Sequence, residues 1–234
     1  VRRYIDVLER LGSSGRLPAA AVRLLADSVR AALAAKRPGD VDSADVQDLK
    51  RIIREAEAVS GIETSGLDAS AARFLNLPFY QTGQVQKAPI GPADVAIVRA
   101  ALEELAPDLI FVAGDLSDPH GTHRVCKEAI DLAVAELWPE RTAPGRPEIW
   151  LYRGAWQEWP VTEATWLVPL SQEELRLKIQ AIFKHQSQKD SAPFPGQDDR
   201  EFWQRVDARN KETAAQLNRL GLAEYYAMEA YVVQ

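Results

Sequence analysis

The 234 residues are 46% hydrophobic, which is enough apolar content for a chain of this length to bury a full core. Lysine and arginine total 28 against 34 aspartate and glutamate residues, and this charge of −6 without a long basic run argues against nucleic acid as a partner. Cys126 is the only cysteine, which excludes an internal disulfide and a cysteine-built zinc ribbon, and favours a reducing, cytoplasmic location.

The first residues, VRRYIDVLERL, form a helical pattern that starts on Val1 without an initiator methionine. They contain neither the apolar core nor the cleavage site of a signal peptide. No segment approaches the roughly 20 apolar residues of a membrane span, so we expect no membrane contact. We interpret the chain as the C-terminal portion of a longer polypeptide.

Two amphipathic helices are predicted next. The first enters near Pro18 and stops at Pro38 and Gly39, and the second spans residues 43–60 with Gly61 able to close it. Residues 61–92 are rich in glycine, threonine and serine and are interpreted mostly as loop.

Helices and strands then alternate. A helical pattern over 92–105 precedes the apolar run Leu109 to Ala113, and helical periodicity resumes from Val125 to Val134. Further strands are expected in EIWLYRGAW and ATWLVPL. Runs that are apolar on consecutive residues suit parallel strands covered on both faces. The pattern predicts an α/β fold, with a parallel sheet flanked by helices, in one domain over 1–234 whose first 60 residues are mainly helical.

The stretch GDLSDPHGTHRVCKEAI follows the first of these strands and holds two of the three histidines. Asp115, Asp118, His120 and His123 should therefore lie beyond the carboxyl end of a parallel strand, where ligand sites gather. Two imidazoles are too few for a catalytic zinc site, which takes three protein ligands and a water. Histidines acting as caps or surface hydrogen-bond donors remain the alternative.

The third histidine lies in VPLSQEELRLKIQAIFKHQSQ, a helix that begins with a Ser171 and Glu174 capping box. Lys178 and His185 are seven residues apart and share a face that could border a pocket, or could be an ordinary solvated helix end. Arg153 and Trp156, in RGAWQEW after the second strand, add a cation and an aromatic plane at the same predicted rim.

Together, DPHGTHR, YRGAWQEW and KIQAIFKHQSQKD resemble the zinc-dependent N-deacetylases of the PIG-L/LmbE-like family, from about Arg51 onward. The resemblance is closest to members named glucosamine-6-phosphate deaminases, a name that we attribute to fusion or confusion with a true deaminase domain. The motif DxHxxHR is complete here, as is KxxAxxxHxSQ. The family's HPDD stretch is absent from the 234 residues, and we expect it, with the N-terminal strands, upstream of Val1.

The resemblance implies a Rossmann-like fold and removal of an acetyl group from an N-acetylglucosamine-type sugar. It implies His123 as a zinc ligand, with the remaining ligands in the upstream segment, and His120, oriented by Asp118, as acid or electrostatic stabiliser. Further family positions and cationic side chains then become candidates for binding the amino-sugar substrate: Arg54, Arg124, Arg153, Trp156, Lys178 and His185.

Two other functions remain open. One is a metal-free glucosamine-6-phosphate deaminase, in which His120 opens the sugar ring and arginines bind the phosphate. The other is a non-catalytic sugar-binding domain, favoured by the absent HPDD stretch. Metal content and the residues before Val1 discriminate among the three, and a homo-oligomer is compatible with each.

Overall fold

The structure is a computed structural model that describes residues 18–80, 88–114, 121–153, 157–188, 200–221 and 224–234. The two predicted N-terminal helices are confirmed as α2 (Ala19–Ala35) and α3 (Ala44–Thr64). Gly61 does not close α3, which continues for three more residues. The predicted loop that follows contains two short 3-10 helices, η1 (Ala69–Ala71) and η2 (Pro78–Tyr80). The helical pattern predicted at Val1 lies outside the described residues.

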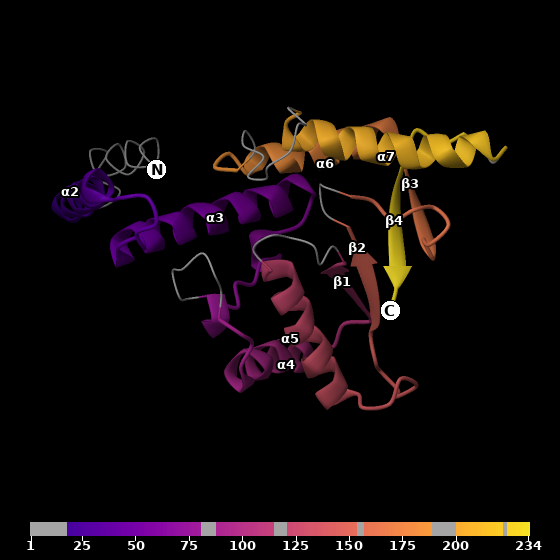
Figure 1. Cartoon of the computed structure of the whole chain (residues 1–234), viewed down its shortest axis with the longest axis horizontal. Helices are drawn as coiled ribbons and strands as arrows, with labels where there is room; N and C mark the ends of the chain where they lie inside the picture. The colour runs from indigo at the N-terminus through magenta and orange to yellow at the C-terminus, as the bar shows by residue number, and fades with distance from the viewer. Residues whose placement is uncertain (1–17, 81–87, 115–120, 154–156, 189–199, 222–223) are drawn as a thin grey trace.

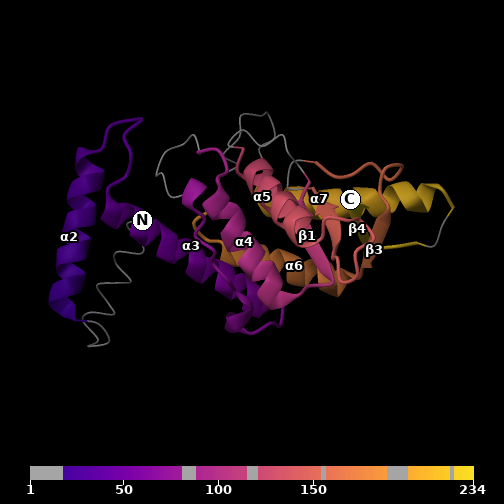
Figure 2. The same ribbon diagram turned by 90° about the horizontal axis from the view of Figure 1, so that it is seen from below.

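Helix α2 packs on the first half of α3, at the end of the molecule farthest from the sheet (Figures 1 and 2). The contact is an apolar cluster at helical spacing, in which Val29 and Val46 are almost fully buried. The second half of α3 continues toward the sheet and packs against α6 (Gln172–Lys184). Helix α3 therefore links the distal helix pair to the elements around the sheet.

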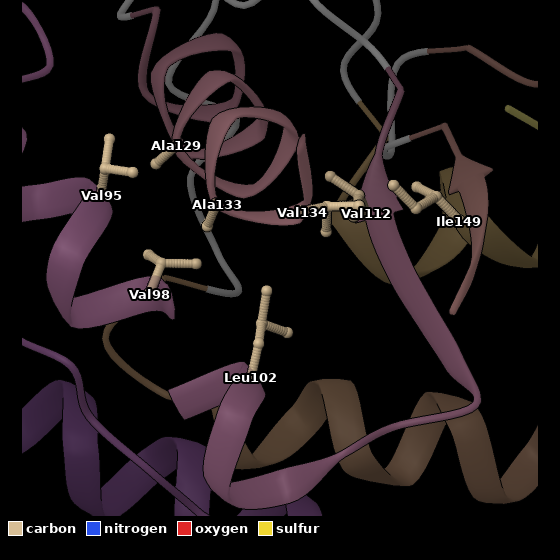
Figure 3. Close-up of a cluster of buried hydrophobic side chains, with 8 residues drawn as sticks. All are labelled: Val95, Val98, Leu102, Val112, Ala129, Ala133, Val134 and Ile149. Carbon is tan, nitrogen blue, oxygen red and sulfur yellow. The ribbon is translucent and has the colours of Figure 1, made fainter. Parts of the chain in front are cut away.

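Helices α4 (Pro92–Leu105) and α5 (Thr122–Leu137) pack together beside strands β1 (Leu109–Ala113) and β2 (Glu148–Tyr152). The two strands pair in parallel, as predicted. Figure 3 shows the apolar core between the helices and strands, in which Ala129 and Ala133 let the helices approach closely. Buried Asp94 caps the start of α4 by accepting hydrogen bonds from the Gly91 and Phe79 backbone N–H groups. All eight members of this core are aliphatic: Val95, Val98, Leu102, Val112, Ala129, Ala133, Val134 and Ile149.

The other half of the sheet is antiparallel. Strand β4 (Ala227–Val233) lies between β2 and β3 (Trp166–Leu170) and runs opposite to both, giving the order β1-β2-β4-β3. The α/β prediction is confirmed, and the sheet is mixed rather than wholly parallel because β4, which was not predicted, inserts beside β2. Helix α7 (Phe202–Arg219) packs on β4. Figure 1 shows α6 and α7 side by side at the end of the sheet toward which β2 points.

Aromatic side chains connect the strands across one face of the sheet. Phe111, Trp150 and Tyr231 make edge and tilted contacts with ring centroids 5.4–5.7 Å apart, and Trp150 stacks on Trp166 at 5.1 Å. Such cross-strand pairs stabilise the register of neighbouring strands. They hold Tyr231 at the centre of β4, next to the site described below.

Among the helices that the structure describes, none combines the length and the apolarity needed to cross a membrane.

Candidate functional site

A pocket of about 290 Å³ opens where β2 ends, between the sheet and helices α6 and α7. The carboxyl end of a strand next to a change in strand direction is a common place for ligand sites in α/β sheets. Apolar groups from α6, α7 and β4 form part of its wall, and charged groups and two tyrosines form the rest. The lining residues are Tyr152, Arg153, Glu158, Lys178, Ile182, Phe202, Val206, Arg209, Glu229, Ala230 and Tyr231.

An ion pair between α6 and β4 forms the first polar group of the pocket. Lys178 Nζ donates to a carboxylate oxygen of Glu229 and, at 3.0 Å, to Oδ1 of fully buried Asn210 on α7. Tyr231 donates its hydroxyl proton to the other oxygen of Glu229. Burial opposes the ionisation of Glu229, but Lys178, the hydrogen bond from Tyr231 and the charge of Arg209 together outweigh that effect, and the carboxyl pKa lies below its ordinary value. Burial, reinforced by the bond to Glu229, raises the pKa of Tyr231 far above its ordinary value.

A second ion pair joins α7 to the segment after β2. Arg209 Nε lies 3.0 Å from Glu158 Oε2, although its N–H is not aligned with that oxygen, and both side chains are about one-seventh exposed. Burial raises the pKa of Glu158, and the charge of Arg209 opposes the rise only in part. The two pocket carboxylates therefore differ, because Glu229 is held ionised while Glu158 is easier to protonate.

Arg153 follows directly on β2 and lies over the ring of Trp159, with Cζ 4.0 Å from the ring centroid. Trp159 is itself fixed, since its indole N–H donates to the Leu151 carbonyl at 2.9 Å and its ring packs on Gly114. A Cβ at Gly114 would lie 2.9 Å from Trp159 Cζ2 and from Leu151 Cβ, so only glycine fits at the end of β1. The side chain of Arg153 is thereby held over a rigid aromatic plane.

The sequence places Lys178 and His185 on one helix face, and the structure directs them to different neighbours. Lys178 contacts β4 and α7, whereas the ring of His185, at the end of α6, lies against Gly61 of α3. The contact is tight, because a Cβ at residue 61 would lie 3.3 Å from His185 Nε2 and the imidazole would have to shift by a few tenths of an ångström. Two residues further, Ser187 donates its backbone N–H and its hydroxyl to buried Glu57, at 2.7 and 2.6 Å. The HxSQ part of the motif thus attaches α6 to α3, and His185 does not line the pocket.

His123 and Arg124 lie in the first turn of α5, which follows β1, and both side chains are exposed. Arg124 Nη2 lies so close to Gly121, at a φ of 66°, that a Cβ there would be 2.9 Å away. Arg54 is exposed on α3, one turn before Glu57. His123, Arg124 and Arg54 are not among the lining residues of the pocket. Asp115, Asp118, His120 and Trp156 lie outside the described residues, so their roles stay predictions.

Zinc does not fit the described residues by themselves. Within the described ranges, no three histidine, cysteine, aspartate or glutamate side chains gather in a way that could hold a metal ion. A zinc site needs three or four such ligands, and His123 alone would supply one. The predicted metal site therefore depends on residues beyond those that the structure describes.

Sequence reasoning found two pocket residues, Arg153 and Lys178, and missed the others that carry charge. Glu158 stands in the quoted stretch RGAWQEW but was not singled out, whereas Arg209 and Glu229 come from α7 and β4, which were not predicted. One signal was available for Glu229: a lone carboxylate inside the apolar strand AMEAYVV requires a buried partner.

No family model matches the chain. Over 206 residues, 87% of its length, the chain is 50% identical to a protein of Bacteroides thetaiotaomicron whose name, glucosamine-6-phosphate deaminase-like protein, is given provisionally. The chain spans 31% of the length of that relative. The similarity connects the chain to a protein named for amino-sugar chemistry, and the resemblance to the PIG-L/LmbE-like family stays a prediction.

Proposed function

We propose that this chain forms the sugar-binding part of an enzyme that acts on an amino sugar. The observation that carries the proposal is the pocket at the end of β2, because Arg153 and Lys178, both selected from the sequence as substrate-binding residues, line the same cavity. Its volume of about 290 Å³ suits one sugar ring better than a polymer. Paired charges and tyrosine hydroxyls can exchange hydrogen bonds with sugar hydroxyls, and the aromatic rings offer apolar contact. The name of the 50% identical relative points to the same substrate class.

The finer proposal is removal of an acetyl group from an N-acetylglucosamine-type sugar by a zinc-dependent hydrolase. Its support is the pair of complete motifs in the sequence, with His123 as one zinc ligand and His120 and Asp118 assisting the reaction. We propose no metal-dependent step for the pocket residues that the structure describes. In this proposal, their part is to bind and orient the sugar at the carboxyl end of β2, which lies beside the carboxyl end of the parallel strand β1.

The zinc proposal has a direct test in metal content. The 234-residue chain, purified and dialysed, should retain well under one zinc per chain, because one imidazole and its neighbouring carboxylates bind weakly. Stoichiometric zinc that resists a chelator would show that Asp115, His120 or His185 completes a site within the chain. That result would overturn our assignment of the ligands.

The reaction is tested on an N-terminally extended protein, in keeping with the proposal that an HPDD stretch lies upstream. Metal-dependent release of acetate from an N-acetylglucosamine derivative is expected, and His123→Ala should abolish zinc retention and turnover together. His120→Ala should retain zinc while kcat falls and KM changes less. An equal loss of zinc in both variants would show that the division of roles within HGTH is wrong.

The deaminase alternative is favoured by the name of the relative. Ammonia release from glucosamine 6-phosphate by this mechanism would need no metal. Chelator-resistant ammonia release would establish it and exclude the deacetylase. Binding of an amino sugar without acetate or ammonia release would establish the non-catalytic alternative.

A further inference from the structure

One edge of the Arg153 guanidinium has no acceptor within the described part of the chain. Nη1 donates to Gln157 Oε1 at 3.2 Å and to the Glu158 carbonyl at 3.4 Å, and Trp159 covers one face of the group. On the opposite edge, Nε is buried and makes no hydrogen bond to any described residue. Nε and Nη2 together form the edge that binds two oxygens of a carboxylate or a phosphate side by side.

The charges of the pocket leave Arg153 as the unbalanced cation among the lining residues. Lys178 is paired with Glu229, and Arg209 with Glu158. The acceptors of Arg153 within the described residues are a neutral amide and a neutral carbonyl, neither of which offsets its charge. The pocket is thus electrostatically suited to an anionic group at its Arg153 side.

We propose that Arg153 binds the phosphate group of a phosphorylated amino sugar through its Nε and Nη2 edge. The proposal rests on the proposed sugar-binding function and adds the substrate class. A buried donor without an acceptor costs free energy, and a phosphate oxygen that accepts from it recovers that cost as affinity. Trp159 fixes the plane of the guanidinium, so little side-chain freedom is lost on binding. Lys178 and Arg209, each held by a carboxylate, are left to contact sugar hydroxyls.

The experiment compares two sugars that differ in the phosphate alone. Titration calorimetry on the 234-residue chain would measure the affinities of glucosamine 6-phosphate and glucosamine, and the readout is their ratio. We expect the phosphorylated sugar to bind at least about tenfold more tightly, the range of one charge-assisted pair of hydrogen bonds. Arg153→Gln should reduce the ratio below about threefold. Arg153→Lys keeps the positive charge but lacks the two side-by-side N–H donors, so it should give an intermediate ratio.

Arg73→Gln is the matched control, because Arg73 is an exposed arginine that bonds to Glu104 of α4 and does not line the pocket. It should leave the ratio unchanged. A general loss of packing at Arg153 lowers both affinities and cancels in the ratio, and melting curves identify a variant that has not folded. In that case Arg153→Lys supplies the test.

Each outcome of the titrations supports or overturns the proposal. A ratio that falls in Arg153→Gln and not in Arg73→Gln supports it, and a ratio that survives in Arg153→Gln overturns it. Equal binding of both sugars by the unaltered chain overturns the phosphate site and leaves the sugar-binding function standing, whereas binding of neither sugar overturns both. Inorganic phosphate should compete with glucosamine 6-phosphate through Arg153, and equal competition in Arg153→Gln would place the phosphate elsewhere.

Discussion

The two halves of the sheet bury different kinds of side chain. Beneath β1 and β2, helices α4 and α5 enclose a core whose buried members are aliphatic, and the buried carboxylate of Asp94 lies at the start of α4 as its cap. Beside β4, helix α7 buries Asn210 and Thr213 together with its apolar residues, and two ion pairs line the pocket there. The pocket lies on the polar half. The aliphatic half supports the fold, and the polar half holds groups that can recognise a ligand.

Energetics explain why this division is informative. Burial of aliphatic area stabilises the folded state at about 25 cal/mol per Å². A buried ion pair contributes little net stability, because desolvation of two charges offsets their attraction. Lys178 with Glu229, and Arg209 with Glu158, are therefore poor choices for stability alone. Their presence around a cavity favours a role in binding.

The largest expected effect tests the aliphatic half. Ile149→Ala, in the core of β2, removes buried methyl and methylene groups and leaves a cavity, so it should lower the free energy of unfolding by about 3 kcal/mol. Urea denaturation measures the change, with Ile52→Ala as the control, because Ile52 is 52% exposed on α3. Equal effects of the two variants would contradict the assigned core.

The next effect tests the polar half. Lys178→Met leaves Glu229 without its main cation and should cost about 2 kcal/mol, whereas the double variant with Glu229→Gln should cost clearly less than the sum of the two single changes. A double-mutant cycle measured by urea denaturation gives the coupling between the residues. Additive costs would show that the pair is not coupled in the folded protein.

A smaller effect appears in the pH dependence of stability. The folded pKa of Glu229 is lowered, so its ionised form stabilises the protein above the unfolded pKa, about 4.3, and this contribution is lost as the pH falls through the folded pKa. Glu158 has the opposite sign: its raised pKa means that ionisation disfavours folding, and the penalty disappears as the pH falls through that pKa. The stability difference between the unaltered chain and Glu229→Gln should therefore shrink from pH 7 to pH 3. A constant difference would contradict the assigned ion pair.

Most of the fold could be predicted from the sequence, because amphipathic spacing and apolar runs mark helices and buried strands locally. The Ser171 and Glu174 capping box is one example, and both of its hydrogen bonds are present. Helix α7 is different: it is mostly polar, and its buried apolar residues Val206, Ala214 and Leu217 form a narrow stripe. Strand β4 carries Glu229 at its centre, and its pairing with β2 is a contact between distant segments.

The candidate site was less predictable, because it also depends on contacts between segments that are distant in the sequence. Arg153 could be found because it follows a strand directly. Lys178 could be found because it borders the apolar stripe of a helix. The partners Glu229 and Arg209 depend on how α7 and β4 return to the sheet, and no local pattern encodes that return. His185 was predicted to border the pocket but lies elsewhere. It contacts Gly61, on a helix more than one hundred residues earlier in the chain, and no local pattern indicates that contact.

The smallest expected effect tests that contact between α3 and α6, which lies apart from both halves of the sheet. Ser187→Ala removes the hydroxyl that donates to Glu57 Oε2 and keeps the backbone donor to Oε1, so one of two described hydrogen bonds between these residues is lost. Glu57 is only 5% exposed, and water replaces the lost donor poorly, so we expect a cost of about 1 kcal/mol in the free energy of unfolding. Ser65→Ala is the control, because that hydroxyl bonds to the Gly61 carbonyl within the end of its own helix.

The ratio of affinities for glucosamine 6-phosphate and glucosamine should be the same in Ser187→Ala as in the unaltered chain. A changed ratio would show that the HxSQ segment influences the pocket directly, and an unchanged stability would show that Glu57 does not hold α6 against α3.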